Sequence, residues 1–278
     1  MATSPQPAYA DAEPVIEVED LVSSYGTRRI LDGVNMSINR GEIRVIMGGS
    51  GSGKTTMLRS LLGLKSPESG TIRILGKPFE ARDPKQMRET RKQMGVAFQG
   101  GALFSSLTVG ENVQIPLREH TRLDERTMDI MTRIKLELVN LAGFEALMPS
   151  ELSGGMIKRA AFARAMIMDP KLLFFDEPSA GLDPITSAEL DDLIIQIRDA
   201  THATIVVVTH ELDSAFKIAD RITVLGKGKV LLTGTVDEVK GSPDETIQDL
   251  LNRRARKEKE DPEHYLARLT AERGRKYD

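Results

Sequence analysis

The chain has 278 residues, of which 40% are hydrophobic and 28% are charged, a composition typical of a globular protein with a sizeable core. Its formal net charge of −3 and aromatic content of 4% provide neither the basic excess nor the stacking side chains of a nucleic-acid-binding protein, so we expect no nucleic-acid partner. The absence of cysteine excludes disulfides and thiolate metal sites.

No apolar run approaches the roughly 18 to 20 residues that span a bilayer, and residues 1–11 carry no signal-peptide pattern, so we expect a soluble, cytoplasmic protein. Residues 1–14 are rich in Ala, Pro and acidic side chains without periodicity and are expected to form a disordered tail. Apolar or alternating runs bounded by turn residues then predict strands over Val15–Leu21, Ile30–Ile38, Ile43–Met47 and Thr71–Leu75. A helix is expected over Thr55–Leu62.

The hydrophobic period becomes helical between about residues 100 and 168, which predicts a helical insertion. The chain then gives a strand, a helix and a second buried strand, at Lys171–Phe175, Ser187–Arg198 and Thr204–Val208. This alternation is typical of a parallel sheet covered on both faces, so we predict an α/β core interrupted by a helical subdomain. Residues 245–278 are helix-compatible and heavily charged, and their mixed signs favour a solvated helix face over a partner-binding arm.

A glycine-rich segment between the third strand and the first helix fits the pattern G-x-x-x-x-G-K-S/T of a P-loop. Its backbone N–H groups and the helix N-terminus attract phosphate oxygens, Lys54 neutralises the β- and γ-phosphates of ATP, and the Thr55 hydroxyl binds Mg²⁺. The residues expected to bind the nucleotide here are Gly48, Gly49, Ser50, Gly51, Ser52, Gly53, Lys54, Thr55 and Thr56.

The apolar strand that begins at Lys171 ends in two adjacent carboxylates, Asp176 and Glu177. Since successive side chains of a strand point to opposite sides, the two groups can have different roles. We expect Asp176 to bind Mg²⁺ directly or through water, and Glu177 to orient or deprotonate the water that attacks the phosphate.

With the segment Leu152-Ser153-Gly154-Gly155 between these two motifs, the chain resembles the ATP-binding cassette (ABC) ATPases from Val15 to about Gly241. The resemblance implies a P-loop fold with a RecA-like parallel-sheet core, an antiparallel β subdomain and an inserted α-helical subdomain, within an ATPase domain over residues 15–244. It also implies a homodimer in which Ser153, Gly154 and Gly155 of one copy face the γ-phosphate bound by Lys54 of the other.

Further positions match the family. The resemblance implies that Tyr25 stacks on adenine, that Gln99 reaches Mg²⁺ or the attacking water, and that His210 contacts the γ-phosphate. Asp183, in the loop Ser179–Asp183, would connect the two sites of the dimer.

Met156 departs from the glutamine that the family usually has after Ser-Gly-Gly, and a thioether cannot form the hydrogen bonds of an amide. The sequence Leu-Ser-Gly-Gly-Met resembles the corresponding segment in the ATPases of phospholipid transporters of the Mla and mammalian-cell-entry (MCE) type. The segments Phe98–Phe104 and Thr108–Val113 resemble the same ATPases. This likeness implies integral-membrane permease subunits, an MCE-domain substrate-binding protein and a small accessory subunit as partners, at the cytoplasmic face of the inner membrane.

We therefore expect an ATPase that energises a permease for phospholipid transport in the bacterial envelope. Three alternatives remain: an ABC ATPase for another cargo such as amino acids or metals, a non-transport ABC protein of regulation or DNA maintenance, and a nucleotide-binding module that has lost hydrolysis. The long coiled-coil inserts, zinc-binding cysteines and tandem cassettes of the second class are absent from the sequence, and Lys54, Asp176, Glu177 and His210 together argue against the third.

Overall fold

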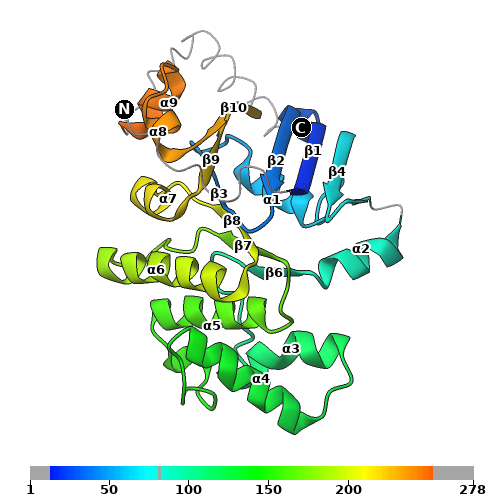
Figure 1. The fold of residues 1–278 in the computed structure, drawn as a ribbon, viewed down its shortest axis with the longest axis vertical. Coiled ribbons are helices and arrows are strands. Elements are labelled where there is room, and N and C mark those ends of the chain that lie inside the picture. The colour runs from blue at the N-terminus through cyan, green and yellow to red at the C-terminus, as the bar shows by residue number, and fades with distance from the viewer. Residues whose placement is uncertain (1–12, 81–82, 253–278) are drawn as a thin grey trace, which may run out of the picture. The chain divides into compact units, whose positions relative to one another are not determined.

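The computed structural model describes residues 13–80 and 83–252 (Figure 1). Contacts divide the described residues into two units, one ending at Ser242 and one beginning at Pro243. The first unit contains both sheets, and the second contains helix α9 (Glu245–Leu251). Within the described ranges, no helix has the length and apolarity that crossing a bilayer requires.

The larger sheet has six strands in the order β10-β9-β3-β8-β7-β6. Neighbouring strands are parallel, except that β10 runs antiparallel to β9. The strands β3 and β8 are buried along their whole length, as expected of strands covered on both faces, and the predicted parallel-sheet core is confirmed. The strand bounds are β3 (Ile43–Gly48), β6 (Met94–Ala97), β7 (Leu172–Asp176), β8 (Thr204–Val208), β9 (Arg221–Gly226) and β10 (Lys229–Gly234).

The smaller sheet is antiparallel and has the order β2-β1-β4-β5. Its inward side chains share one core with α1 (Lys54–Leu61) and with one face of the larger sheet, through residues such as Ile38, Leu58 and Val206. The antiparallel β subdomain implied by the family resemblance is therefore present. The strand bounds are β1 (Pro14–Tyr25), β2 (Arg28–Asn39), β4 (Ser69–Ile74) and β5 (Lys77–Pro78).

Three helices between β6 and β7 pack against one another and form the helical subdomain: α3 (Val109–His120), α4 (Glu125–Leu138) and α5 (Gly154–Met166). Figure 1 shows them grouped beneath the larger sheet, with α6 (Pro184–Thr201) alongside. Helix α3 begins only after a capping box of Thr108 and Glu111, so the first residues of the predicted insertion are not helical. The remaining helical elements of the first unit are α2 (Pro84–Arg91), the 3₁₀ turn η1 (Pro149–Glu151), α7 (Leu212–Ile218) and α8 (Val236–Lys240).

Helix α2 and strands β9 and β10 were not predicted from the sequence. Helix α2 has Thr90 as its one buried residue, so it has no apolar stripe, although Asp83 caps it and Pro84 begins it. Of the tail expected over residues 1–14, residues 1–12 lie outside the described residues, and β1 begins at Pro14. Residues 253–278 of the charged C-terminal segment also lie outside them.

A buried ion pair lies beside the start of β3. The Arg44 guanidinium donates to Glu42 Oε1 over 2.6 Å and to the Thr223 hydroxyl over 3.0 Å, and both charged side chains are at most 2% exposed. Burial raises the pKa of the Glu42 carboxyl, and the adjacent Arg44 charge opposes this effect. Arg44 is therefore the main charge that compensates for the burial of the Glu42 carboxyl.

We predict that Arg44→Met lowers the free energy of unfolding by about 3 to 5 kcal/mol at pH 7, because it leaves a buried carboxylate without its partner. Since the folded-state pKa of Glu42 is raised, the penalty for its charge is present above the unfolded pKa and disappears as Glu42 protonates. The loss in free energy of unfolding caused by Arg44→Met should therefore become smaller as the pH falls toward 4.5, the ordinary pKa of glutamate.

Urea unfolding at pH 7 and pH 5 measures both effects. The matched control is Arg29→Met, which removes a surface arginine that pairs with Asp32 and should cost no more than about 1 kcal/mol. Equal losses for the two variants would contradict the structural role of the buried pair.

Candidate nucleotide site

Four loops with predicted site residues leave the larger sheet at one edge, because the strands that precede them are parallel. Ala97 of β6 pairs with Phe175 of β7, and Asp176 pairs with Val208 of β8. The ends of these strands are therefore aligned with each other, and Ile46 of β3 is paired with Val208 in the same way. The loops that contain the P-loop, Gln99, Glu177 and His210 consequently start from one line across the sheet.

The P-loop is held in a conformation that glycine permits. Gly53 has φ 107° at the N-cap of α1, and a Cβ there would lie 2.7 Å from Leu31 Cδ2. The Lys54 ammonium donates to the carbonyl oxygens of Gly48 and Gly49, over 2.7 and 3.2 Å, so the side chain lies over its own loop. The Ser52 hydroxyl is buried without a hydrogen-bond partner, which an anion in the loop would supply.

The remaining P-loop residues differ in their accessibility. Thr56 is buried, whereas the other four are exposed at the surface of the loop and the first helical turn: Gly49, Ser50, Gly51 and Thr55. Exposed backbone at a helix N-terminus is the geometry that binds phosphate.

Two carboxylates face the P-loop lysine. Burial lowers the pKa of Lys54, while the charges of Glu177 and Asp176 act to raise it. Burial and the neighbouring Glu177 raise the pKa of Asp176, and no hydrogen bond or ion pair to its carboxylate is found among the described residues. A cation bound beside Asp176 would relieve this unfavourable charge.

Glu177 is fixed by contacts with the end of β8. Its backbone is left-handed, with φ 47°, and its N–H donates to the Val208 carbonyl over 2.8 Å. The Thr209 hydroxyl donates to Glu177 Oε2 over 3.2 Å, and His210 Nδ1 lies 2.9 Å from the same oxygen. The structure thus brings Glu177 and His210, two of the predicted site residues, into contact.

Thr209 was not among the residues predicted for the site, and the strand predicted before it ends at Val208. A polar residue directly after the apolar run that ends β8 is the signal that could have found it. Gln99 lies in the exposed turn after β6, and its backbone carbonyl accepts a hydrogen bond from the Lys158 ammonium. No sequence pattern distinguished Lys158 from the other charged residues of α5.

Tyr25 lies at the end of β1, in the antiparallel sheet, and is 48% exposed. Its hydroxyl accepts a hydrogen bond from Arg59 over 3.1 Å, and this bond lowers the pKa of the phenol. The Lys65 ammonium lies 4.2 Å from the ring centroid. Arg59 belongs to the helix that the P-loop begins, so Tyr25 is connected to the phosphate loop through α1.

The segment Ser153-Gly154-Gly155 forms the N-terminus of α5. Ser153 is the N-cap, and its hydroxyl oxygen accepts the Met156 N–H over 3.3 Å. A Cβ on Gly155 would lie 2.7 Å from Thr186 Cγ2, so glycine lets α5 approach α6 closely. Asp183 caps α6 in the same manner, by accepting the backbone N–H groups of Ile185 and Thr186 over 3.0 Å.

Ser153, Gly154 and Asp183 are exposed, and no hydrogen bond or ion pair of the described residues joins them to the P-loop. Within one chain, the predicted site residues therefore fall into two groups. One group contains the P-loop, Asp176, Glu177 and His210 at the sheet edge, and the other contains the exposed ends of α5 and α6.

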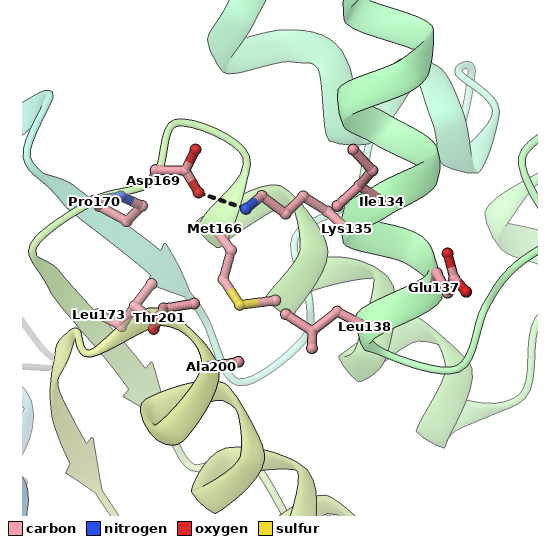
Figure 2. A pocket seen from close by; sticks show the side chains of 10 residues that line it. All are labelled: Ile134, Lys135, Glu137, Leu138, Met166, Asp169, Pro170, Leu173, Ala200 and Thr201. Carbon is pink, nitrogen blue, oxygen red and sulfur yellow. Dashed lines mark hydrogen bonds and ion pairs between the residues drawn. The ribbon is translucent and has the colours of Figure 1, made fainter.

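Two of the grooves that border the helical subdomain are lined in part by α5. One, of about 390 Å³, lies beside the Gln99 turn and is lined by Phe98, Phe104, Pro116 and Arg164, among others. The other, of about 580 Å³, lies between α4 and the C-terminal ends of α5 and α6, and Figure 2 shows the ion pair of Lys135 with Asp169 that spans part of it. None of the residues predicted to bind nucleotide lines either groove.

Sequence comparisons agree with this geometry. The profile of the family described as ABC transporter matches residues 31–180. The chain is 41% identical over 237 residues to the intermembrane phospholipid transport system ATP-binding protein MlaF of Haemophilus influenzae, covering 85% of this chain and 90% of that protein. It is 40% identical over 239 residues to the probable ribonucleotide transport ATP-binding protein mkl of Mycobacterium leprae, covering 86% of this chain and 69% of that protein.

Solved structures give the same result. The fold is similar to cbiO1 from Clostridium perfringens, part of the ABC transporter complex cbiONQ, with a TM-score of 0.77 and 31% identity over 87% of this chain and 96% of that one. It is also similar to the dimeric post-hydrolysis state of the ATP-binding cassette MJ0796 bound to ADP and Pi, with a TM-score of 0.73 and 30% identity over 80% of this chain and 98% of that one. The chain therefore belongs to the ABC transporter family, as one of its ATP-hydrolysing cassettes.

Proposed function

We propose that two copies of this chain bind two ATP molecules between them and hydrolyse them to drive a separate membrane permease. The division of the site residues into two groups supports this arrangement, since each P-loop would need the Ser153 end of a second copy. The N-terminus of α6 beside Asp183 also exposes Ile185, which is 75% accessible and suits a protein interface. The similar cassette MJ0796 is described as dimeric.

We further propose that Thr55, Asp176 and Gln99 hold Mg²⁺. The half-buried Asp176 carboxylate, with its raised pKa and no hydrogen-bond partner among the described residues, fits a hard cation. Bound Mg²⁺ would neutralise charge on the phosphates. Lys54 would bind the β- and γ-phosphates once it leaves the loop carbonyls that it contacts here.

In the proposed mechanism, Glu177 orients the attacking water and accepts its proton. Thr209 and His210 hold Oε2, while Oε1 accepts no hydrogen bond from the described residues and can face the water. His210, whose side chain is 57% exposed, can turn toward the γ-phosphate. Tyr25 would stack on adenine, and Asp183 would connect the two sites.

For the cargo, we propose phospholipid, moved between membranes of the bacterial envelope. The observation that carries this proposal is the 41% identity to MlaF, which extends over 90% of that protein. A ribonucleotide is the second candidate, because mkl is almost as similar, but the chain spans only 69% of mkl. The methionine that follows Leu152-Ser153-Gly154-Gly155 in this chain, Met156, also matches the sequence of the Mla-type ATPases.

The proposed permease contact is the 390 Å³ groove beside the Gln99 turn. Phe104 and Phe98 are 57% and 38% exposed there, and Pro116 lines the same groove, so a short apolar segment of a membrane protein could bind in it. The partners would also include an MCE-domain protein and a small accessory subunit, with the ATPase on the cytoplasmic face of the inner membrane.

We predict that Glu177→Gln reduces ATP turnover at least a hundredfold while ATP binding persists, because the amide cannot accept the proton of water. Phosphate release measures turnover, and size-exclusion chromatography with ATP should show a stable dimer. The matched control is Glu89→Gln, which alters a surface carboxylate paired with Lys92 and should leave turnover unchanged. Normal turnover in Glu177→Gln would remove this residue from its proposed role.

Mixed dimers test whether each site is shared between two copies. Lys54→Met and Ser153→Glu should each abolish turnover alone, because both sites of the homodimer lose one half. In a mixed dimer of the two variants, one site retains both intact halves. When the two variants are mixed in equal amounts, about half of the dimers contain one copy of each, and each of these has one intact site of two. The mixture should therefore contain about a quarter of the intact sites of the wild type. No recovery in demonstrably mixed dimers would contradict the shared site.

The groove is tested by Phe104→Ser, which we expect to lower recovery of the permease with the affinity-tagged ATPase at least fivefold. Loss of an exposed aromatic anchor typically costs 2 kcal/mol or more of binding free energy. Leu64→Ser is the control, because Leu64 is 59% exposed and lies outside the groove. Equal recovery of the permease with both variants would place the contact elsewhere.

A further inference from the structure

Lys158 on α5 is a buried cation that forms no ion pair with a carboxylate in the part of the chain that the structure describes. It is 6% exposed, and lysine is rarely buried to this extent without a partner. Its ammonium donates to two backbone carbonyls, those of Gln99 and Glu177, the latter over 3.2 Å. These residues are far apart in the sequence, and each lies in a different loop of the proposed catalytic site.

The Lys158 ammonium donates to the carbonyl of Glu177, a residue whose backbone is strained. A non-glycine residue with φ 47° carries a cost of order 1 to 3 kcal/mol, so surrounding contacts must hold it in place. The Glu177 carbonyl accepts from Lys158 and from the Ala180 N–H over 3.2 Å, while its own N–H donates to Val208. Lys158 is thus the contact from the helical subdomain that fixes the direction of this peptide.

The turn that contains Gln99 accepts hydrogen bonds from Lys158 and also from a second residue of α5. Gly101 and Ala102 are both left-handed, with φ 74° and 50°, and their carbonyls accept from the Arg164 guanidinium over 2.7 and 2.6 Å. Two cations of α5 therefore hold this short turn. Only Lys158 of the two also contacts the Glu177 loop.

We propose that Lys158 is a positioning residue for ATP hydrolysis, which keeps the Gln99 turn and the Glu177 peptide at a fixed separation. Because Lys158 belongs to the helix that Ser153 caps, a movement of that helix displaces both loops together. Lys158 makes no hydrogen bond to the P-loop or to Tyr25, so it acts on the chemical step rather than on nucleotide affinity. The inference rests on the proposed roles of Gln99 and Glu177.

The test is Lys158→Met in the full-length chain, assayed for kcat and for KM of ATP. We expect kcat to fall ten- to a hundredfold, the loss that follows from a catalytic group displaced by about 1 Å, with KM within twofold of wild type. Lys158→Arg keeps a cation that can reach both carbonyls, and should recover kcat to within about threefold of wild type. A wild-type kcat in Lys158→Met, or a rise in KM that matches the loss of kcat, would overturn the proposal.

Lys135→Met is the matched control, because Lys135 is also a mostly buried lysine of the helical subdomain, 12% exposed. Its partner Asp169 lines the groove of Figure 2, which none of the residues predicted to bind nucleotide lines. Its kcat should equal that of wild type. Circular dichroism melting reports whether each variant is folded. If Lys158→Met does not fold, Lys158→Gln replaces it, with the same expected separation of kcat from KM and the same overturning outcomes.

A double variant separates positioning from a general loss of structure. If Lys158 acts through Gln99, the loss of kcat in Gln99→Ala with Lys158→Met should be clearly smaller than the product of the two single losses. Losses that multiply fully would overturn the proposal. A failure of the proposed function itself is distinguishable, because it would appear as normal turnover in Glu177→Gln, whatever the result for Lys158.

Discussion

The parallel alignment of β3, β8, β7 and β6 is the constraint on which the rest of the site depends. Side chains from four distant parts of the sequence become neighbours because these strands end at one edge of the sheet. The same edge gathers like charges, and burial together with Glu177 raises the pKa of Asp176. Such an arrangement is unfavourable alone and becomes favourable when a cation and a polyanion enter it.

The P-loop and the N-terminus of α5 are not joined by any hydrogen bond or ion pair of the described residues. Lys54 donates to the carbonyls of Gly48 and Gly49, and these two bonds satisfy its ammonium in this structure. The N-terminus of α5, with its partial positive charge, is exposed at another place on the chain. If two copies share each ATP as proposed above, nucleotide binding is linked to association of the copies.

Helix α5 contacts several elements that carry residues of the proposed ATPase site. Ser153 caps its N-terminus, Gly155 allows it to pack closely on α6, and Lys158 and Arg164 reach the turn that follows β6. Most of these contacts go to backbone atoms rather than to side chains. Backbone contacts fix where a loop lies whatever side chains it carries, which suits the positioning role proposed for Lys158.

The sequence by itself determined the P-loop, the carboxylate pair and the alternation of strands and helices, because each depends on residues close together in the chain. It missed α2, which has no apolar stripe. Only the tertiary structure decided that Thr209 and His210 hold Glu177 and that Lys158 bridges two loops. These contacts join residues far apart in sequence, and the composition of α5 gives no indication of which cation will be buried. Their geometry exists only once the strands have aligned and the helical subdomain has packed.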